Sequence, residues 1–198
     1  MSQLTLTSDP LGSATTGTFE FENPAFYMTG ATSQRGAVLV DQFILLQATN
    51  TLTSQTAAQA LFDVTGNGAV TLVAGAYEFD CVFSLSSMSS SSGSFGFALG
   101  GTATLSQYWW SNANKATLAT AAGGQVTYNT AANTAIATAT TATVGFARCG
   151  GILTVTVGGT VIPQVSLGVA AAAVVGVGSY FKIRALGGAA VTSIGNWS

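Results

Sequence analysis

Strict alternation of apolar and polar residues is the feature that most constrains the fold of this chain. In the stretch GAYEFDCVFSL, residues 75–85, large apolar side chains occupy every second position while Glu78, Asp80 and Ser84 lie between them. A period of two places one set of side chains on each face of a β-strand. This stretch predicts a half-buried strand with an aromatic inner face.

Similar patterns recur along the chain, separated by glycines and rich in Val, Ile and Thr, while helical periodicity is nearly absent. Strands are expected within residues 17–28, 38–47, 69–75, 92–101, 134–146, 160–167, 179–186 and 190–197. A bend or bulge at Gly150-Gly151 is expected to divide residues 143–159 into two strands, and Pro163 is expected at a sheet edge or bulge. Residues 54–62 favour one short helix or turn, with Ser54 placed to cap its first turn. About eight to ten strands predict an all-β sandwich or barrel.

The chain divides into a polar arm over residues 1–17 and one domain over residues 18–198. Its most apolar stretch, residues 165–183, contains about eleven consecutive weakly apolar positions, whereas a membrane helix needs about 20. We therefore expect no membrane insertion. The first residues lack the features of a signal peptide, so a cytoplasmic product is expected.

Charge is scarce and segregated. Charged residues make up 6% of the 198 residues, and the net charge is −2. All seven acids lie at or before Asp80, and four of the five cations lie after it. A surface this poor in charge favours contact with other subunits, and the two segments of opposite sign favour association between copies. The cations are too dispersed for a nucleic-acid site.

Candidate catalytic groups are few. The chain has no histidine, which removes the commonest general base and metal ligand. Glu78 and Asp80 share a strand face and could act together, although a solvated or subunit-facing surface is the simpler interpretation. Cys81 and Cys149 are expected as buried free thiols rather than as a disulfide. We predict no enzyme, no cofactor and no metal site.

Two groups of residues are candidates for recognition. In QYWWSN, adjacent Trp109 and Trp110 should face opposite sides of a strand, one in the core and one exposed, and Tyr108 lies beside them. These three residues are the surface-recognition candidates, for a glycan or a subunit. In residues 165–183, two strands joined by a loop of small residues would let copies approach closely. The trimer-interface candidates are Val169, Ala170, Ala172, Val174 and Tyr180.

Four segments together resemble a family of virion proteins: residues 68–85, residues 93–105, residues 159–183 and residues 191–198. They are similar to small capsid-surface or tail-fibre-head proteins of tailed phages and prophages, which have a C1q/TNF-like trimeric jelly roll. The resemblance covers residues 17–198 and implies a non-enzymatic homotrimer in the virion. Because no collagen-like or coiled-coil shaft precedes the domain, the resemblance favours a capsid decoration or cement protein. Such a protein would bind other virion proteins, such as the major capsid protein or a tail component. The alternative is a tail-fibre knob that binds a host glycan or protein.

Overall fold

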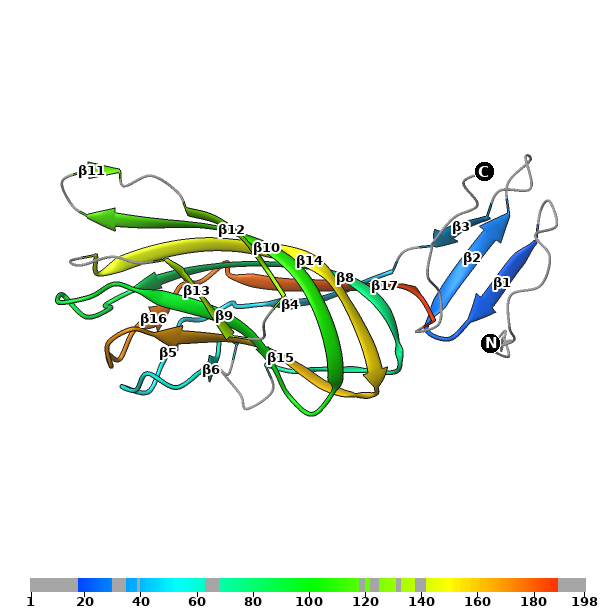
Figure 1. Ribbon diagram of the computed structural model, residues 1–198, viewed down its shortest axis with the longest axis horizontal. Helices are drawn as coiled ribbons and strands as arrows, with labels where there is room; N and C mark the ends of the chain where they lie inside the picture. The colour runs from blue at the N-terminus through cyan, green and yellow to red at the C-terminus, as the bar shows by residue number, and fades with distance from the viewer. Residues whose placement is uncertain are drawn as a thin grey trace.

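The computed structural model describes residues 18–29, 35–38, 40–62, 68–117, 120–121, 125–130, 133–137 and 142–188. Within these ranges the chain forms strands and turns and no helix. The prediction of an all-β protein is confirmed, and the strands form two large sheets and one small one (Figure 1). The predicted arm over residues 1–17 and the last predicted strand, residues 190–197, lie outside the described residues.

The small sheet lies at one end of the molecule and contains β1 (Phe19–Glu22), β2 (Ala25–Thr29) and β3 (Arg35–Val38) in that order (Figure 1). The prediction of one strand over residues 17–28 is wrong, because a turn at Asn23-Pro24 makes this segment an antiparallel hairpin. The strands β1, β2 and β3, which the sequence analysis placed in the jelly-roll domain, therefore form a sheet of their own.

The larger sheet has nine strands. Its path runs β11-β10-β14-β8-β16-β5, β12 pairs with β10, and β17 lies between β8 and β4. Their bounds are β4 Asp41–Leu45, β5 Asn50–Thr51, β8 Gly75–Ser86, β10 Thr104–Thr117, β11 Thr120–Ala121, β12 Gln125–Asn129, β14 Val144–Val157, β16 Val174–Val175 and β17 Tyr180–Gly187.

The second large sheet has five strands in the order β13-β9-β15-β6, and β7 also pairs with β15. Their bounds are β6 Gln59–Ala60, β7 Val70–Leu72, β9 Phe95–Gly100, β13 Asn133–Ala137 and β15 Gly159–Leu167. The two sheets face each other, as in a β-sandwich (Figure 1).

The core fills the space between the sheets and follows the predicted alternation. Every odd-numbered residue of β8 from Tyr77 to Leu85 is buried, and β9 supplies Phe95, Phe97 and Leu99 from the opposite sheet. The ring of Phe97 lies at the centre of this cluster, with ring centroids 6.3 Å from Phe79, 6.2 Å from Phe83 and 5.2 Å from Trp109. The inner aromatic face predicted for residues 75–85 is confirmed.

The predicted helix or turn over residues 54–62 is wrong as a helix. Bends and turns make up much of the segment, in line with the turn alternative, and only Gln59–Ala60 forms a strand, β6, which pairs with Gln164 and Val165. The side-chain amide of Asn50 donates to the carbonyls of Ala60 and Leu61, and Leu61 is fully buried. Long-range pairing with β15 outweighs the local helix preference of this alanine-containing segment.

The predicted break at Gly150-Gly151 is also wrong, because β14 runs through both glycines as one strand. A Cβ atom at Gly151 would lie 2.2 Å from the carbonyl oxygen of Tyr108, so glycine allows β10 to lie very close to β14. Pro163 does not mark an edge strand, since β15 has partners on both sides. It lies between the β7 and β6 pairings, and its carbonyl accepts a hydrogen bond from Leu61.

Candidate interaction surfaces

The outer face of the nine-stranded sheet carries a group of exposed aromatic and apolar side chains on β10, β12 and β14. Tyr108, Trp110 and Tyr128 expose 54%, 40% and 70% of their surface. We call this group the aromatic face: Tyr108, Trp110, Val126, Tyr128, Phe146 and Ile152. Scattered apolar residues are normal on a protein surface, but a contiguous group on neighbouring strands indicates an interaction site.

The two tryptophans separate as the alternation predicts, with Trp109 buried and Trp110 exposed. Trp109 lies edge-on against Phe97 in the core, at an interplanar angle of 73°. The prediction of Trp109 as a surface-recognition residue is therefore wrong, because its side chain lies in the core. Tyr108 and Trp110 remain on the surface.

The side chain of Trp110 is positioned by its neighbours on β14. A Cβ atom at Gly150 would lie 3.0 Å from Cζ2 of Trp110, so the absence of a side chain at Gly150 leaves room for the indole. The guanidinium carbon of Arg148 lies 5.9 Å from the centre of the indole ring, within range of a cation–π interaction. The indole is thus held in a defined orientation against the sheet.

Ion pairs lie beside the aromatic face on the same side of the sheet. We call them the ion-pair ladder: Asp80–Arg148, Glu78–Arg184 and Asp41–Lys182. These six residues are all the charged side chains that the structure describes between residues 40 and 188. The segregation of charge along the sequence favours association between copies. The described charges instead pair within one chain, because antiparallel strands bring the acidic β8 beside the basic β14 and β17.

Asp80 is the centre of the ladder. Its carboxylate accepts hydrogen bonds from Nε and Nη2 of Arg148, at 2.9 and 3.1 Å, and from the hydroxyl of Tyr180 at 2.9 Å. Burial and the hydrogen bond with Asp80 raise the pKa of Tyr180. The hydrogen bond and the charge of Asp80 raise the pKa of Arg148. Asp80 thereby joins three strands through one carboxylate.

Glu78 and Asp80 are each bound by a different arginine, so they do not form a free pair of carboxylates. Nε of Arg184 donates to Glu78 at 2.8 Å, while Asp80 binds Arg148. The ranges that the structure describes contain no group of three or more acids or cysteines placed to hold a metal ion. The simpler interpretation of these carboxylates, as part of a sheet surface, agrees with this geometry.

The two cysteines face each other across β8 and β14 and are fully buried as free thiols, which confirms the sequence prediction. Burial raises the pKa of both thiols. They are therefore protonated core side chains at neutral pH.

The trimer-interface candidates fall into two groups. Val174 and Tyr180 are half-buried on the outer face of the nine-stranded sheet, where Tyr180 stacks on exposed Phe43 with ring centroids 5.2 Å apart. Val169, Ala170 and Ala172 are exposed in the segment between β15 and β16.

Sequence reasoning missed the apolar residues beside Tyr180. Phe43 and Leu45 expose about half of their surface on β4, and Val177 exposes 61% in the turn before β17. Asp41, Phe43 and Leu45 are every second residue of β4 and therefore share one face. The sequence pattern did not show whether this face lies inside or outside.

No described helix is long and apolar enough to cross a membrane. No protein-family model, curated protein or solved structure matches the chain.

Proposed function

We propose that this protein is a non-enzymatic, homotrimeric structural protein of a phage particle, which coats or cements the capsid. The observation that carries the proposal is the outer face of the nine-stranded sheet. This face combines exposed aromatic side chains with charges that already have partners in the same chain. The virion setting comes from the resemblance of the sequence to phage surface proteins.

The strand order supports a jelly roll as the finer description of the sandwich. Along the chain, β7, β9 and β15 belong to the five-stranded sheet, and β8, β14 and β17 belong to the nine-stranded sheet. Chain crossing between two facing sheets is the property that jelly rolls share. The C1q/TNF-like form implies three copies around an axis.

The physical basis of assembly is burial of the aromatic face and of the residues around Tyr180. A stable interface removes on the order of 800 Å² of surface from each partner and places aromatic residues at its centre. A charged group left unpaired in such an interface is strongly unfavourable. Because Asp80 and Glu78 already bind arginines, a second copy can cover this face without supplying countercharges.

The first experiment measures the oligomeric state. Native mass spectrometry and light scattering should show a trimer of 19.8 kDa chains that survives dilution. Phe43→Asp and Ala172→Asp each add one charge at an exposed apolar or small position, and both should weaken the trimer. Ser91→Asp adds the same charge in the exposed serine loop and should leave it intact. A wild-type monomer at micromolar concentration would contradict the proposal.

The second experiment tests the position on a particle. Gold-labelled protein added to phage particles that lack it should decorate the capsid surface in electron micrographs, with release in the Phe43→Asp variant. Label at the tail tip alone would exclude a decoration protein and favour a tail-fibre knob.

The exposed rings of Tyr108 and Trp110 favour the knob as a second candidate function. Aromatic rings held flat beside polar side chains stack on the apolar faces of sugars. On a glycan array, the wild type should be retained and Trp110→Ala should lose at least about tenfold in affinity, while Val157→Ala serves as an exposed control. Absence of retention by the wild type would exclude this function.

A further inference from the structure

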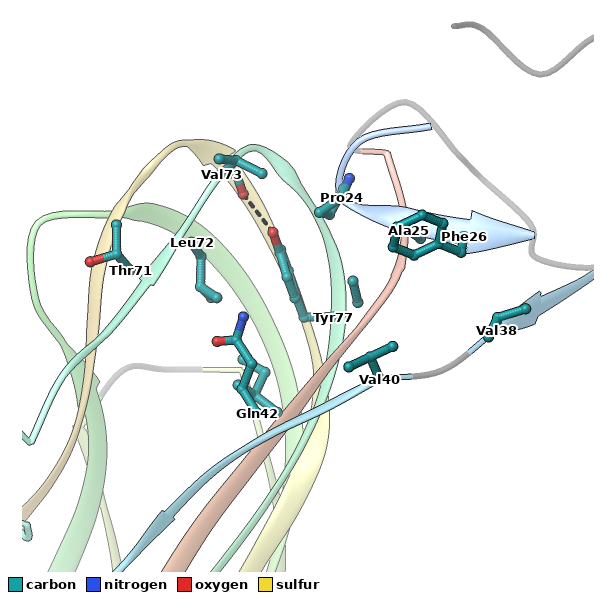
Figure 2. Close-up of a pocket in the computed structure, with 12 residues that line it drawn as sticks. Pro24, Ala25, Phe26, Val38, Val40, Gln42, Thr71, Leu72, Val73 and Tyr77 are labelled. Atoms are coloured by element: carbon teal, nitrogen blue, oxygen red, sulfur yellow. Dashed lines mark hydrogen bonds between the residues drawn. The ribbon is translucent and has the colours of Figure 1, made fainter. Parts of the chain in front are cut away.

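A cavity of about 300 Å³ lies between the small sheet and the sandwich (Figure 2). It is bounded by β2 and β3 on one side and by β4, β7, β8 and β17 on the other. Its lining residues are Pro24, Ala25, Phe26, Val38, Val40, Gln42, Thr71, Leu72, Val73, Tyr77, Ile183 and Ala185. Neither the trimer proposal nor the aromatic face involves this cavity.

Contacts beside the cavity hold its two sides together. The Tyr27 hydroxyl donates to the carbonyl of Leu186 at 2.9 Å. A Cβ atom at Gly75 would lie 2.9 Å from ring carbons of Pro24, so the hairpin turn packs directly on the start of β8. These contacts attach the small sheet to the sandwich while a space remains between them.

The walls are mostly apolar, and the rim carries both apolar and uncharged polar side chains. Leu72, Tyr77 and Ile183 are buried at the sandwich side of the cavity. Val40 and Val73 expose 61% and 43% of their surface at its opening, which leaves two branched apolar side chains in contact with water. An apolar occupant would remove both from water and so bind favourably.

The polar groups of the cavity are few and uncharged. Figure 2 shows the Gln42 amide pointing toward Leu72 and Tyr77, where it offers a donor and an acceptor. The Tyr77 hydroxyl donates its proton to the carbonyl of Val73 at 2.9 Å, and burial raises the pKa of this phenol. None of the twelve lining residues is charged.

We propose that this cavity binds an uncharged, flat and mostly apolar molecule of about two fused rings, with one hydroxyl or amide group that hydrogen-bonds to Gln42. The size follows from the volume, because an apolar cavity of about 150 Å³ holds one benzene ring. The lack of charge follows from the lining, since a charged ligand would lose its hydration without gaining a countercharge. Concave apolar sites with a few placed polar groups are typical small-molecule sites.

The test uses 2-naphthol, naphthalene and 2-naphthoate as matched probes in an NMR titration of the full-length protein with labelled valine and leucine methyl groups. With about eleven non-hydrogen atoms, 2-naphthol should bind with a dissociation constant on the order of 10 µM to 1 mM. The methyl signals of Val40, Val73 and Leu72 should shift, while those of Val126 and Val144, exposed elsewhere, should not. The carboxylate of 2-naphthoate should weaken binding at least about tenfold.

Two variants test the geometry. Ala185→Phe fills the cavity from β17 and should abolish the shifts of Val40 and Val73. If that variant fails to fold, Gln42→Leu replaces the amide with an apolar group of similar size at an exposed position of β4. This variant should bind 2-naphthol about two- to twelvefold more weakly and naphthalene equally well.

Three results would overturn the proposal. In the first, 2-naphthol shifts only the methyl signals of the aromatic face. In the second, a folded Ala185→Phe variant binds 2-naphthol with unchanged affinity. The third is binding only after subunits dissociate, which would assign the cavity to a side chain of a neighbouring copy. The first two results leave the proposed trimer untouched and the third requires association between copies, so failure here is distinguishable from failure of the proposed function.

Discussion

Substitution of Asp80 by asparagine tests whether the ion-pair ladder organises the outer face of the sheet. The Asp80→Asn side chain has the same size, but an NH₂ group replaces one of the two carboxylate oxygens. Oδ2 accepts hydrogen bonds from Nη2 of Arg148 and from the hydroxyl of Tyr180. A donor at that position would oppose both of these donors, and only one oxygen would remain to accept.

The expected loss follows from these contacts and from their exposure. A hydrogen bond to a charged group contributes about 1.5–3 kcal/mol when it is buried. The Arg148 side chain is 54% exposed and can turn to water, which reduces the loss, whereas the Asp80 side chain is only 14% exposed. We expect the free energy of unfolding to fall by about 2 kcal/mol, or the melting temperature by about 4–8 °C.

Asp41→Asn provides the matched control. Asp41 lies on the same face, but its oxygen is 3.9 Å from Nζ of Lys182 and both side chains are partly exposed. An ion pair of this kind contributes about 0–0.5 kcal/mol. The assay is urea unfolding followed by tryptophan fluorescence at one fixed protein concentration, with both variants in parallel. Equal losses in the two variants, within about 0.3 kcal/mol, would refute the central role of Asp80.

Three further predictions concern the core. Phe97→Ala should destabilise the fold by about 3–5 kcal/mol in urea unfolding, because its ring contacts aromatic side chains from two strands of the facing sheet; a loss below about 1 kcal/mol would show that the sheets do not pack as described. Gly151→Ala should cost at least about 2 kcal/mol in the same assay, since its methyl group would overlap a carbonyl of β10; wild-type stability would contradict that close approach. The raised pKa of the Cys81 and Cys149 thiols makes stability constant below pH about 9 and lower above it, where the unfolded chain releases protons that the folded chain retains. Each thiol should lower the free energy of unfolding by up to about 1.4 kcal/mol per pH unit. In urea unfolding from pH of about 8 to about 10.5, the free energy of unfolding should decline less steeply when both cysteines are replaced by Ala. Identical slopes in the two proteins would contradict the raised pKa of the thiols.

Local alternation along the sequence was sufficient to predict one class of features. A period of two identified the buried side chains of residues 75–85, and the same rule separated Trp109 from Trp110. In residues 95–99 it identified the large buried side chains, but Ala98, expected on the outer face, is buried as well. Such patterns are reliable where one face of a strand is buried and the other is not, because a shift of one residue would expose the whole apolar set.

Features that depend on distant partners could not be predicted in this way. Within the helix-like segment at residues 54–62, Gln59–Ala60 forms a strand because it pairs with β15, about a hundred residues away in sequence. Gly151 has the sequence context of a point where a strand breaks, but the reason for glycine lies in the neighbouring strand β10. The cavity at Gln42 likewise joins segments from four regions of the chain, none of which carries a binding motif of its own.

The placement of charge is the strongest physical link between this fold and the proposed assembly. If the few charges served mainly to keep a monomer soluble, they would be expected as unpaired groups spread over the surface. The described ones between residues 40 and 188 are instead paired across neighbouring strands of a single sheet face, beside exposed aromatic rings. Because each pair is satisfied within one chain, these charges offer little attraction to another copy, and the free energy of the proposed association would come from apolar burial. High salt, which screens electrostatic attraction between chains, should therefore leave the proposed trimer intact.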